Sequence, residues 1–278
     1  GSCSLKHLKQ GGFLGHPASY NWYPYAPGMD APAVEPNSRS RLQAEKKRVK
    51  ELIPPAVRFP YIKMGRSISG FRLNQTGSKF GPFENQLFLG DYTLSVIMRA
   101  TTEQINGVWQ GACYPFREGL ATGIMHVEFS PKGQLIAGGF TTNRQWPVRG
   151  TEPFALQRLD WTGEVPFEIK EINIKKDGFL IHFTKPIDKR LAAVDGTYSI
   201  TTYTHNYAAG YGSPEVDHTT SKVTKASPSS DGISVRVYLK TIVEGHIHDF
   251  DLAPLTSNDG EKLLHSKAYY TVNEIPKN

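Results

Sequence analysis

The chain has 278 residues, enough for about two domains with a substantial core. Its formal net charge of +6 is spread along the chain and not gathered on a basic face with interleaved aromatic residues, so nucleic-acid binding is not expected. No run approaches the roughly 20 apolar residues of a spanning helix, so no membrane span is expected either. An aromatic content of 11% with 26 Gly and 19 Pro favours an all-β protein, because rings pack on pleated sheets while Gly and Pro end short strands.

The N-terminal part of the sequence is irregular before it becomes helical. Residues 1 to about 38 are broken repeatedly by Gly and Pro, which predicts a loop carrying aromatic side chains. The segment 39–52 places Leu42, Val49 and Leu52 near one face and is followed by Pro54 and Pro55, which predicts a helix at about 39–52.

Two hairpins are predicted in the next hundred residues. Residues 81–91 and 96–99 form a strand pair bounded by Gly and Asp, and 123–138 alternates before and after a Ser-Pro-Lys-Gly turn. Their spacing of about thirty to forty residues is typical of β-propeller blades. Because a closed propeller needs at least about four blades, the region 1–163 is predicted to hold the terminal blades of a partial β-propeller.

A second domain is predicted at 164–278. The character of the sequence changes at 162–166; residues 179–183 then alternate with period two after a Lys-Asp-Gly turn, and 233–239 repeat the pattern after another turn. Roughly seven short strands in about 110 residues fit an immunoglobulin-like β-sandwich. The predicted fold class is therefore all-β, with partial β-propeller blades followed by an immunoglobulin-like β-sandwich.

Only two cysteines, Cys3 and Cys113, are present, which excludes a disulfide framework and leaves a single bridge between them open. Cys113 stands among aromatic residues, which favours a buried, inert thiol over a nucleophile.

Several motifs carry a family resemblance. The turn at 11–17 and the blade motifs at 85–91 and 131–135 resemble those of glucose/sorbosone dehydrogenase-type propellers. The sequence resembles more closely a group of large secreted proteins known as membrane-bound dehydrogenases in Planctomycetes, Verrucomicrobia and Bacteroidetes. That resemblance covers nearly the whole chain and is carried by the segments 110–116, 154–163, 211–217 and 264–270.

The resemblance implies a six-bladed propeller followed by an immunoglobulin-like module, in a secreted or periplasmic bacterial protein that can associate with the cell surface. It also implies that the remaining propeller blades, or another protein chain, are a partner. Family members are frequently accompanied by a haem c domain, but no Cys-x-x-Cys-His occurs here, so this chain carries no covalent haem c.

The cofactor is left open by the sequence. The strand matching 123–127 carries an Arg-x-Arg pair in quinone-dependent relatives, where it clamps cofactor carboxylates. This chain has Gly123, Met125 and His126 there, which counts against a pyrroloquinoline quinone site. An enzymatic activity therefore stays open as well.

Candidate ligand-binding residues lie in predicted loops and on the second hairpin. His126 could act as a base or ligand, although a packed histidine is the simpler interpretation. Trp and Arg side chains suit sugar binding through ring stacking and hydrogen bonds to hydroxyls, and such residues follow predicted strands at Arg117, Asn143, Arg144, Trp146 and Arg149. In the N-terminal loop, aromatic residues including His16 and Trp22 could line a carbohydrate groove or could simply cover a core.

A metal site is not predicted. His246 and His248 alternate on a predicted strand and could point to one face, but two ligands are too few for zinc.

The sequence thus supports two hypotheses. The first is the C-terminal portion of a secreted, sugar-dehydrogenase-like propeller protein that is inactive as an isolated chain. The second is a non-catalytic carbohydrate- or protein-binding scaffold. Open strand edges of a partial propeller would need a cover, because unpaired edges favour association.

Overall fold

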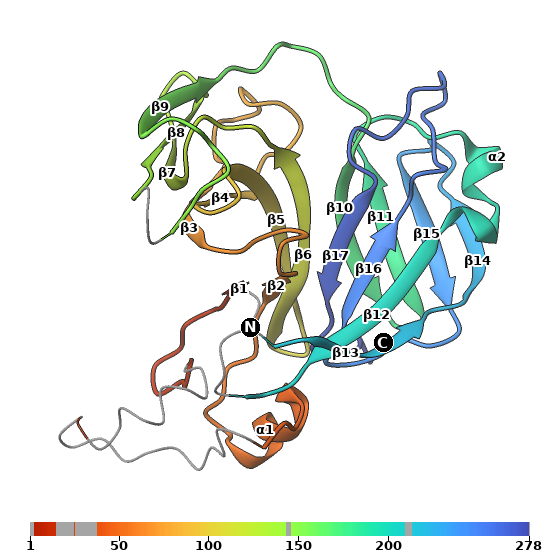
Figure 1. The fold of residues 1–278 in the computed structure, drawn as a ribbon. Helices are drawn as coiled ribbons and strands as arrows, with labels where there is room; N and C mark the ends of the chain where they lie inside the picture. The colour runs from red at the N-terminus through yellow and green to blue at the C-terminus, as the bar shows by residue number, and fades with distance from the viewer. Residues whose placement is uncertain (1–2, 15–24, 26–37, 143–145, 209–212, 278) are drawn as a thin grey trace.

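The structure is a computed structural model, and it describes residues 3–14, 25, 38–142, 146–208 and 213–277 (Figure 1). The prediction of an all-β protein is confirmed: the strands form several antiparallel sheets, and none of those described closes into a barrel. No helix of the described residues is long and apolar enough to cross a membrane. The thiols of Cys3 and Cys113 are both free.

Strands from both ends of the sequence build the largest sheet. It has eight strands in the order β13 (Glu215–Thr220), β12 (Ser199–His205), β16 (Ile247–Asp251), β17 (Lys267–Thr271), β6 (Val108–Arg117), β5 (Val96–Ile105), β4 (Leu87–Asp91) and β3 (Ile68–Leu73).

The fold contains three smaller sheets among the described residues. The four-stranded sheet has the order β10 (Ile169–Lys175), β11 (Gly178–Phe183), β15 (Ser234–Leu239) and β14 (Val223–Pro228). A three-stranded sheet contains β7 (Ile124–Phe129), β8 (Leu135–Phe140) and β9 (Phe154–Leu159), and a two-stranded sheet pairs β1 (Cys3–Leu5) with β2 (Val57–Phe59). The short helices are α1 (Leu42–Arg48) and α2 (Lys189–Ala192), with a 3-10 turn at Asp195–Thr197.

Both predicted hairpins are present. β4 pairs with β5, and the buried Asp91 closes their turn by accepting hydrogen bonds from the backbone N–H groups of Leu94, Arg66 and Ser67, each at 2.7 Å. β7 pairs with β8 through a turn at Gly133, whose φ of +84° favours glycine. The alternating pattern therefore located these strands correctly.

The predicted helix is shorter than expected. It was expected at about 39–52, but α1 covers only Leu42–Arg48. Arg41 has extended backbone angles and makes no side-chain cap, and Val49 is extended too (φ −112°, ψ 96°). Val49 and Leu52 instead pack with Tyr207 in a small cluster, so tertiary burial overrides the helical pattern there.

The four-stranded sheet and part of the eight-stranded sheet enclose a common core. The predicted alternation in 179–183 is confirmed, since Phe179, Ile181 and Phe183 are all buried. The Phe179 ring lies 5.1 Å from the Phe250 ring and 5.2 Å from that of Tyr270, both in edge-on arrangements.

The eight-stranded sheet joins the two parts of the chain that the sequence assigns to separate domains. β17 pairs directly with β6, with Tyr270 opposite Ala112. The buried Tyr270 hydroxyl donates to Glu103 Oε1 (2.6 Å) and accepts from Gln110 Nε2 (3.1 Å). The division into domains at 163/164 stays a prediction, but the strands on either side of it share main-chain hydrogen bonds.

Two buried histidines predict how stability depends on pH. Burial lowers the pKa of His248 to about 3 and that of His205 to about 4. Since both folded pKa values lie below the unfolded value of about 6.5, their stabilisation is fully present above pH 6.5 and is lost as the pH falls toward 4. We expect the free energy of unfolding to fall by up to about 2.7 kcal/mol per pH unit in this window.

Urea unfolding at several values between pH 7 and pH 4 measures this slope. The variant His205→Gln should roughly halve it, while the exposed His7→Gln should leave it unchanged. A free energy of unfolding that stays constant down to pH 4.5 would contradict the burial of the two neutral rings.

Candidate ligand-binding pocket

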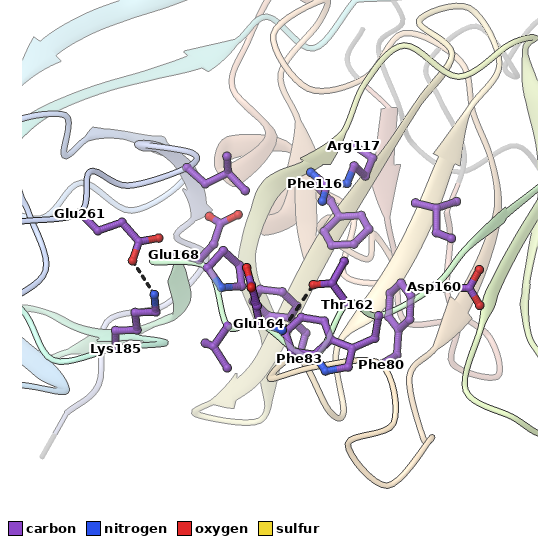
Figure 2. Close-up of a pocket in the computed structure, with 15 residues that line it drawn as sticks. Phe80, Phe83, Phe116, Arg117, Asp160, Thr162, Glu164, Glu168, Lys185 and Glu261 are labelled. Carbon is purple, nitrogen blue, oxygen red and sulfur yellow. Dashed lines mark hydrogen bonds and ion pairs between the residues drawn. The ribbon is translucent and has the colours of Figure 1, made fainter.

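A cavity of about 540 Å³ lies where the connection from β9 to β10 passes between the two parts of the molecule (Figures 1 and 2). Strand ends and loops far apart in the sequence contribute to it. Its walls are formed by Phe80, Phe83, Phe116, Arg117, Leu159, Asp160, Trp161, Thr162, Glu164, Val165, Pro166, Glu168, Lys185, Glu261 and Leu264. A volume of this size lies in the range usual for small-ligand sites.

One wall of the cavity is aromatic. Phe80 and Phe83 are buried, and Phe116 lies partly exposed against both, with ring centroids 6.0 Å and 6.2 Å away. The perpendicular packing of Phe83 on Phe116 (86°) fixes the orientation of the Phe116 ring. The wall is thus a rigid apolar surface.

The lack of a side chain at Gly81 allows Trp161 to lie against this wall. A Cβ at Gly81 would come within 2.6 Å of the Trp161 ring, and Gly81 has φ +76°, where other residues are strained. Trp161 itself stays partly exposed and packs on the cluster of Phe80 and Phe88. The absent side chain at Gly81 therefore lets the indole lie close to the main chain.

The inner end of the cavity holds a buried carboxylate. Glu168 is 2% exposed, and its Oε1 lies 2.6 Å from Nδ1 of His265. Oε2 is buried and has no hydrogen-bond partner among the described residues. A buried carboxylate oxygen without a donor is costly, so this atom is an acceptor available to a bound hydroxyl or water.

A buried arginine lies behind Glu168. The guanidinium of Arg99 donates to Gln86 Oε1 (2.6 Å) and to the carbonyl of Ile169 (3.0 Å), and it lies 3.8 Å from the centre of the Phe83 ring. Burial lowers the pKa of Arg99 to about 10, and the charge of Glu168 opposes that shift. Arg99 therefore stays charged at neutral pH and partly balances the carboxylate.

Charged groups of both signs surround the opening. Figure 2 shows the Lys185–Glu261 ion pair on one side, Asp160 on the other and the phenylalanine rings between them. Hydrogen bonds from Gln134 and then Arg158 lower the pKa of Asp160. Arg117 stacks at 5.6 Å from the Phe116 ring and has no carboxylate partner among the described residues.

The candidate residues from the sequence are dispersed in the structure. Arg117 lines the cavity. Arg149 lines a separate hollow of about 30 Å³, and Trp146, which is 55% exposed, does not line the main cavity. His126 is exposed on β7. Four candidates lie outside the described residues: Asn143, Arg144, His16 and Trp22.

The strand that the resemblance assigns to a quinone does not fit one. β7 presents the exposed Met125 and His126, and the neighbouring Arg72 is already paired with Glu128 at 2.8 Å. No arginine pair is therefore present on β7 to hold cofactor carboxylates.

A metal centre is not formed by the described residues, because no group of three His, Cys, Asp or Glu side chains there could hold an ion. His246 Nδ1 lies 3.0 Å from the Thr202 hydroxyl, and the ring of His248 packs on that of Phe179.

Sequence reasoning missed most of the cavity. Three lining residues follow the β9–β10 connection in the sequence: Glu168, Lys185 and Glu261. They lie near the aromatic wall because of the way the chain folds after that connection, which no local pattern indicates. The segment 80–83, with two phenylalanines around a Gly-Pro pair, was the available signal for the wall. Comparison with models of known families, with curated proteins and with solved structures finds no match to this chain.

Proposed function

We propose that the chain is a non-catalytic binding scaffold and that the cavity around Trp161 takes a carbohydrate. The observation that carries the proposal is the combination of two partly exposed rings, Trp161 and Phe116, with hydrogen-bonding groups that have no side-chain partner among the described residues. Flat rings pack against the apolar face of a sugar ring. Arg117 at the opening can donate to hydroxyls, and the buried Glu168 Oε2 can accept from them.

The mixture of charges supports a neutral, polyhydroxylated ligand over an ionic one. Lys185 is paired with Glu261, and Asp160 with Arg158. The cavity therefore offers both hydrogen-bond donors and hydrogen-bond acceptors. A ligand rich in hydroxyl groups needs both, since each hydroxyl donates and accepts.

The expected architecture and location belong to the same proposal. We infer partial propeller blades in 1–163 and an immunoglobulin-like sandwich in 164–278, in a secreted or periplasmic bacterial protein. The sharing of one core between the four-stranded sheet and strands β12, β16 and β17 supports the sandwich. The hairpins β4–β5 and β7–β8 support the blades.

A sugar-dehydrogenase-like portion of a larger protein is the second candidate. The observation that favours it is the β7–β8 hairpin, which forms where the resemblance expects a blade strand. β7 lacks the arginine pair that would hold the quinone carboxylates.

Calorimetric titration with a panel of neutral mono- and oligosaccharides tests the binding proposal. We expect a saturable ligand in the panel, and we expect Trp161→Ala to weaken it by about tenfold or more through loss of the stacking surface. Trp146→Ala removes an exposed indole outside the cavity and is the matched control.

Two results would refute a sugar site here. One is the absence of binding across the panel. The other is an equal loss of affinity in Trp161→Ala and Trp146→Ala, which would place the ligand elsewhere or indicate general stickiness of the tryptophans.

A further inference from the structure

The edge strand β9 carries two of the most exposed large apolar side chains among the described residues. Phe154 is 75% exposed and Leu156 is 79% exposed, on the same face of the three-stranded sheet. The neighbouring Phe140 on β8 is opposite Phe154 and is 46% exposed. Exposed apolar side chains concentrated on the edge strand of a sheet are typical of an interaction surface.

No described residue hydrogen-bonds to the main-chain groups on the outer side of β9. Among the described residues β9 pairs with β8 alone. The N–H of Thr141 donates to the carbonyl of Pro153 at 2.9 Å, and this pair continues the register in which Ala155 opposes Gly139. Since hydrogen-bonded pairs alternate in antiparallel sheets, the odd-numbered residues of β9 bond to β8.

The even-numbered residues therefore direct both main-chain groups away from β8. These are Phe154, Leu156 and Arg158, whose side chains also lie on the exposed face. Beyond them the edge is closed, because the N–H of Glu152 donates to the carbonyl of Ala121 at 2.9 Å. The open part of the edge is thus short, and it presents the main-chain groups of only these three residues to a partner strand.

We propose that β9 is a dimerisation edge and that its occupant is β9 of a second copy of this chain. An antiparallel pair with a two-fold axis at Leu156 places Leu156 opposite Leu156, and Phe154 opposite Arg158, in both directions. All three residues then use their free N–H and C=O groups, which gives about six main-chain hydrogen bonds. The edge is self-complementary, as a two-fold interface requires.

The side chains suit the same register. The two Leu156 side chains meet at the axis, and each Arg158 comes opposite an aromatic ring and not opposite another cation, so a cation–π contact can form. The two three-stranded sheets become one six-stranded sheet with a continuous apolar stripe. This inference uses none of the proposed ligand contacts at Trp161, Phe116, Arg117 and Glu168, although Arg158 is also paired with Asp160 at the edge of that cavity.

The test introduces a charge at Leu156, where the proposed two-fold axis passes. Sedimentation velocity of the wild-type chain over a wide concentration range should show a monomer–dimer equilibrium. Leu156→Lys places two like charges opposite each other and should weaken the dimer by at least about tenfold, and Leu156→Glu should do the same. An equimolar mixture of the two variants should restore association, because opposite charges then face each other.

A matched control and a second readout complete the experiment. Leu8→Lys adds the same charge at an apolar residue that is 67% exposed, and it should leave the dimer unchanged. Amide hydrogen exchange at Phe154, Leu156 and Arg158 should slow as concentration rises. A chain that stays monomeric, a dimer insensitive to Leu156→Lys, a mixture that does not associate, or edge amides already protected in the monomer would each overturn the proposal.

Discussion

Replacing Arg99 with methionine should lower the free energy of unfolding by about 3–5 kcal/mol, because it removes one partner of a buried charged network and leaves the others unpaired. Arg99 is 0% exposed and is hydrogen-bonded to Gln86 Oε1 and to the carbonyl of Ile169. Those contacts connect β5 with the start of β10. Urea denaturation monitored by circular dichroism measures the change.

Thr102→Ala is the control for Arg99→Met, since it alters an exposed side chain on the same strand, β5. It should change the free energy of unfolding by no more than about 0.5 kcal/mol. A methionine variant as stable as the wild type would show that the charge of Arg99 is not needed between the two sheets, and the account of the inner end of the cavity would have to be withdrawn.

Replacing Phe179 with alanine should cost about 3–5 kcal/mol of unfolding free energy, as expected for a large buried ring that leaves a cavity. Phe179 is fully buried and its ring contacts those of Phe250, Tyr270 and His248, each from the opposing sheet. The melting temperature and the denaturation midpoint should both fall.

Phe71→Ala provides the comparison, because Phe71 is 54% exposed on the edge strand β3. Its loss should be small, within about 0.5 kcal/mol. Equal effects of the two substitutions would mean that the four-stranded sheet does not pack on β16 and β17 as the ring contacts indicate.

The sequence predicted strands well where one face is buried and where apolar and polar residues alternate regularly along the strand. Phe179, Ile181 and Phe183 are all buried, and the turn at Gly133 joins β7 to β8. Local pattern is sufficient in these cases because alternate side chains must leave water. Local pattern alone also made the predicted helix too long. Val49 and Leu52 fit a helical face, but they pack with Tyr207 outside the helix.

The pairing of β17 with β6 could not be predicted, because the two strands are separated by about 150 residues and no local signal selects one edge over another. The cavity depends on that pairing and on the crossing from β9 to β10. Glu168 therefore looked like an ordinary charged residue in the sequence, although it is buried opposite His265 in the structure.

The measurement that most directly tests the carbohydrate proposal is a nuclear magnetic resonance titration that follows the indole N–H signals of the tryptophans. The best sugar of the panel should shift the Trp161 signal with a saturable dependence on concentration, while the signals of Trp109 and Trp146, which do not line the cavity, stay in place. A Trp161 signal that does not move under conditions where the sugar is bound would contradict the account.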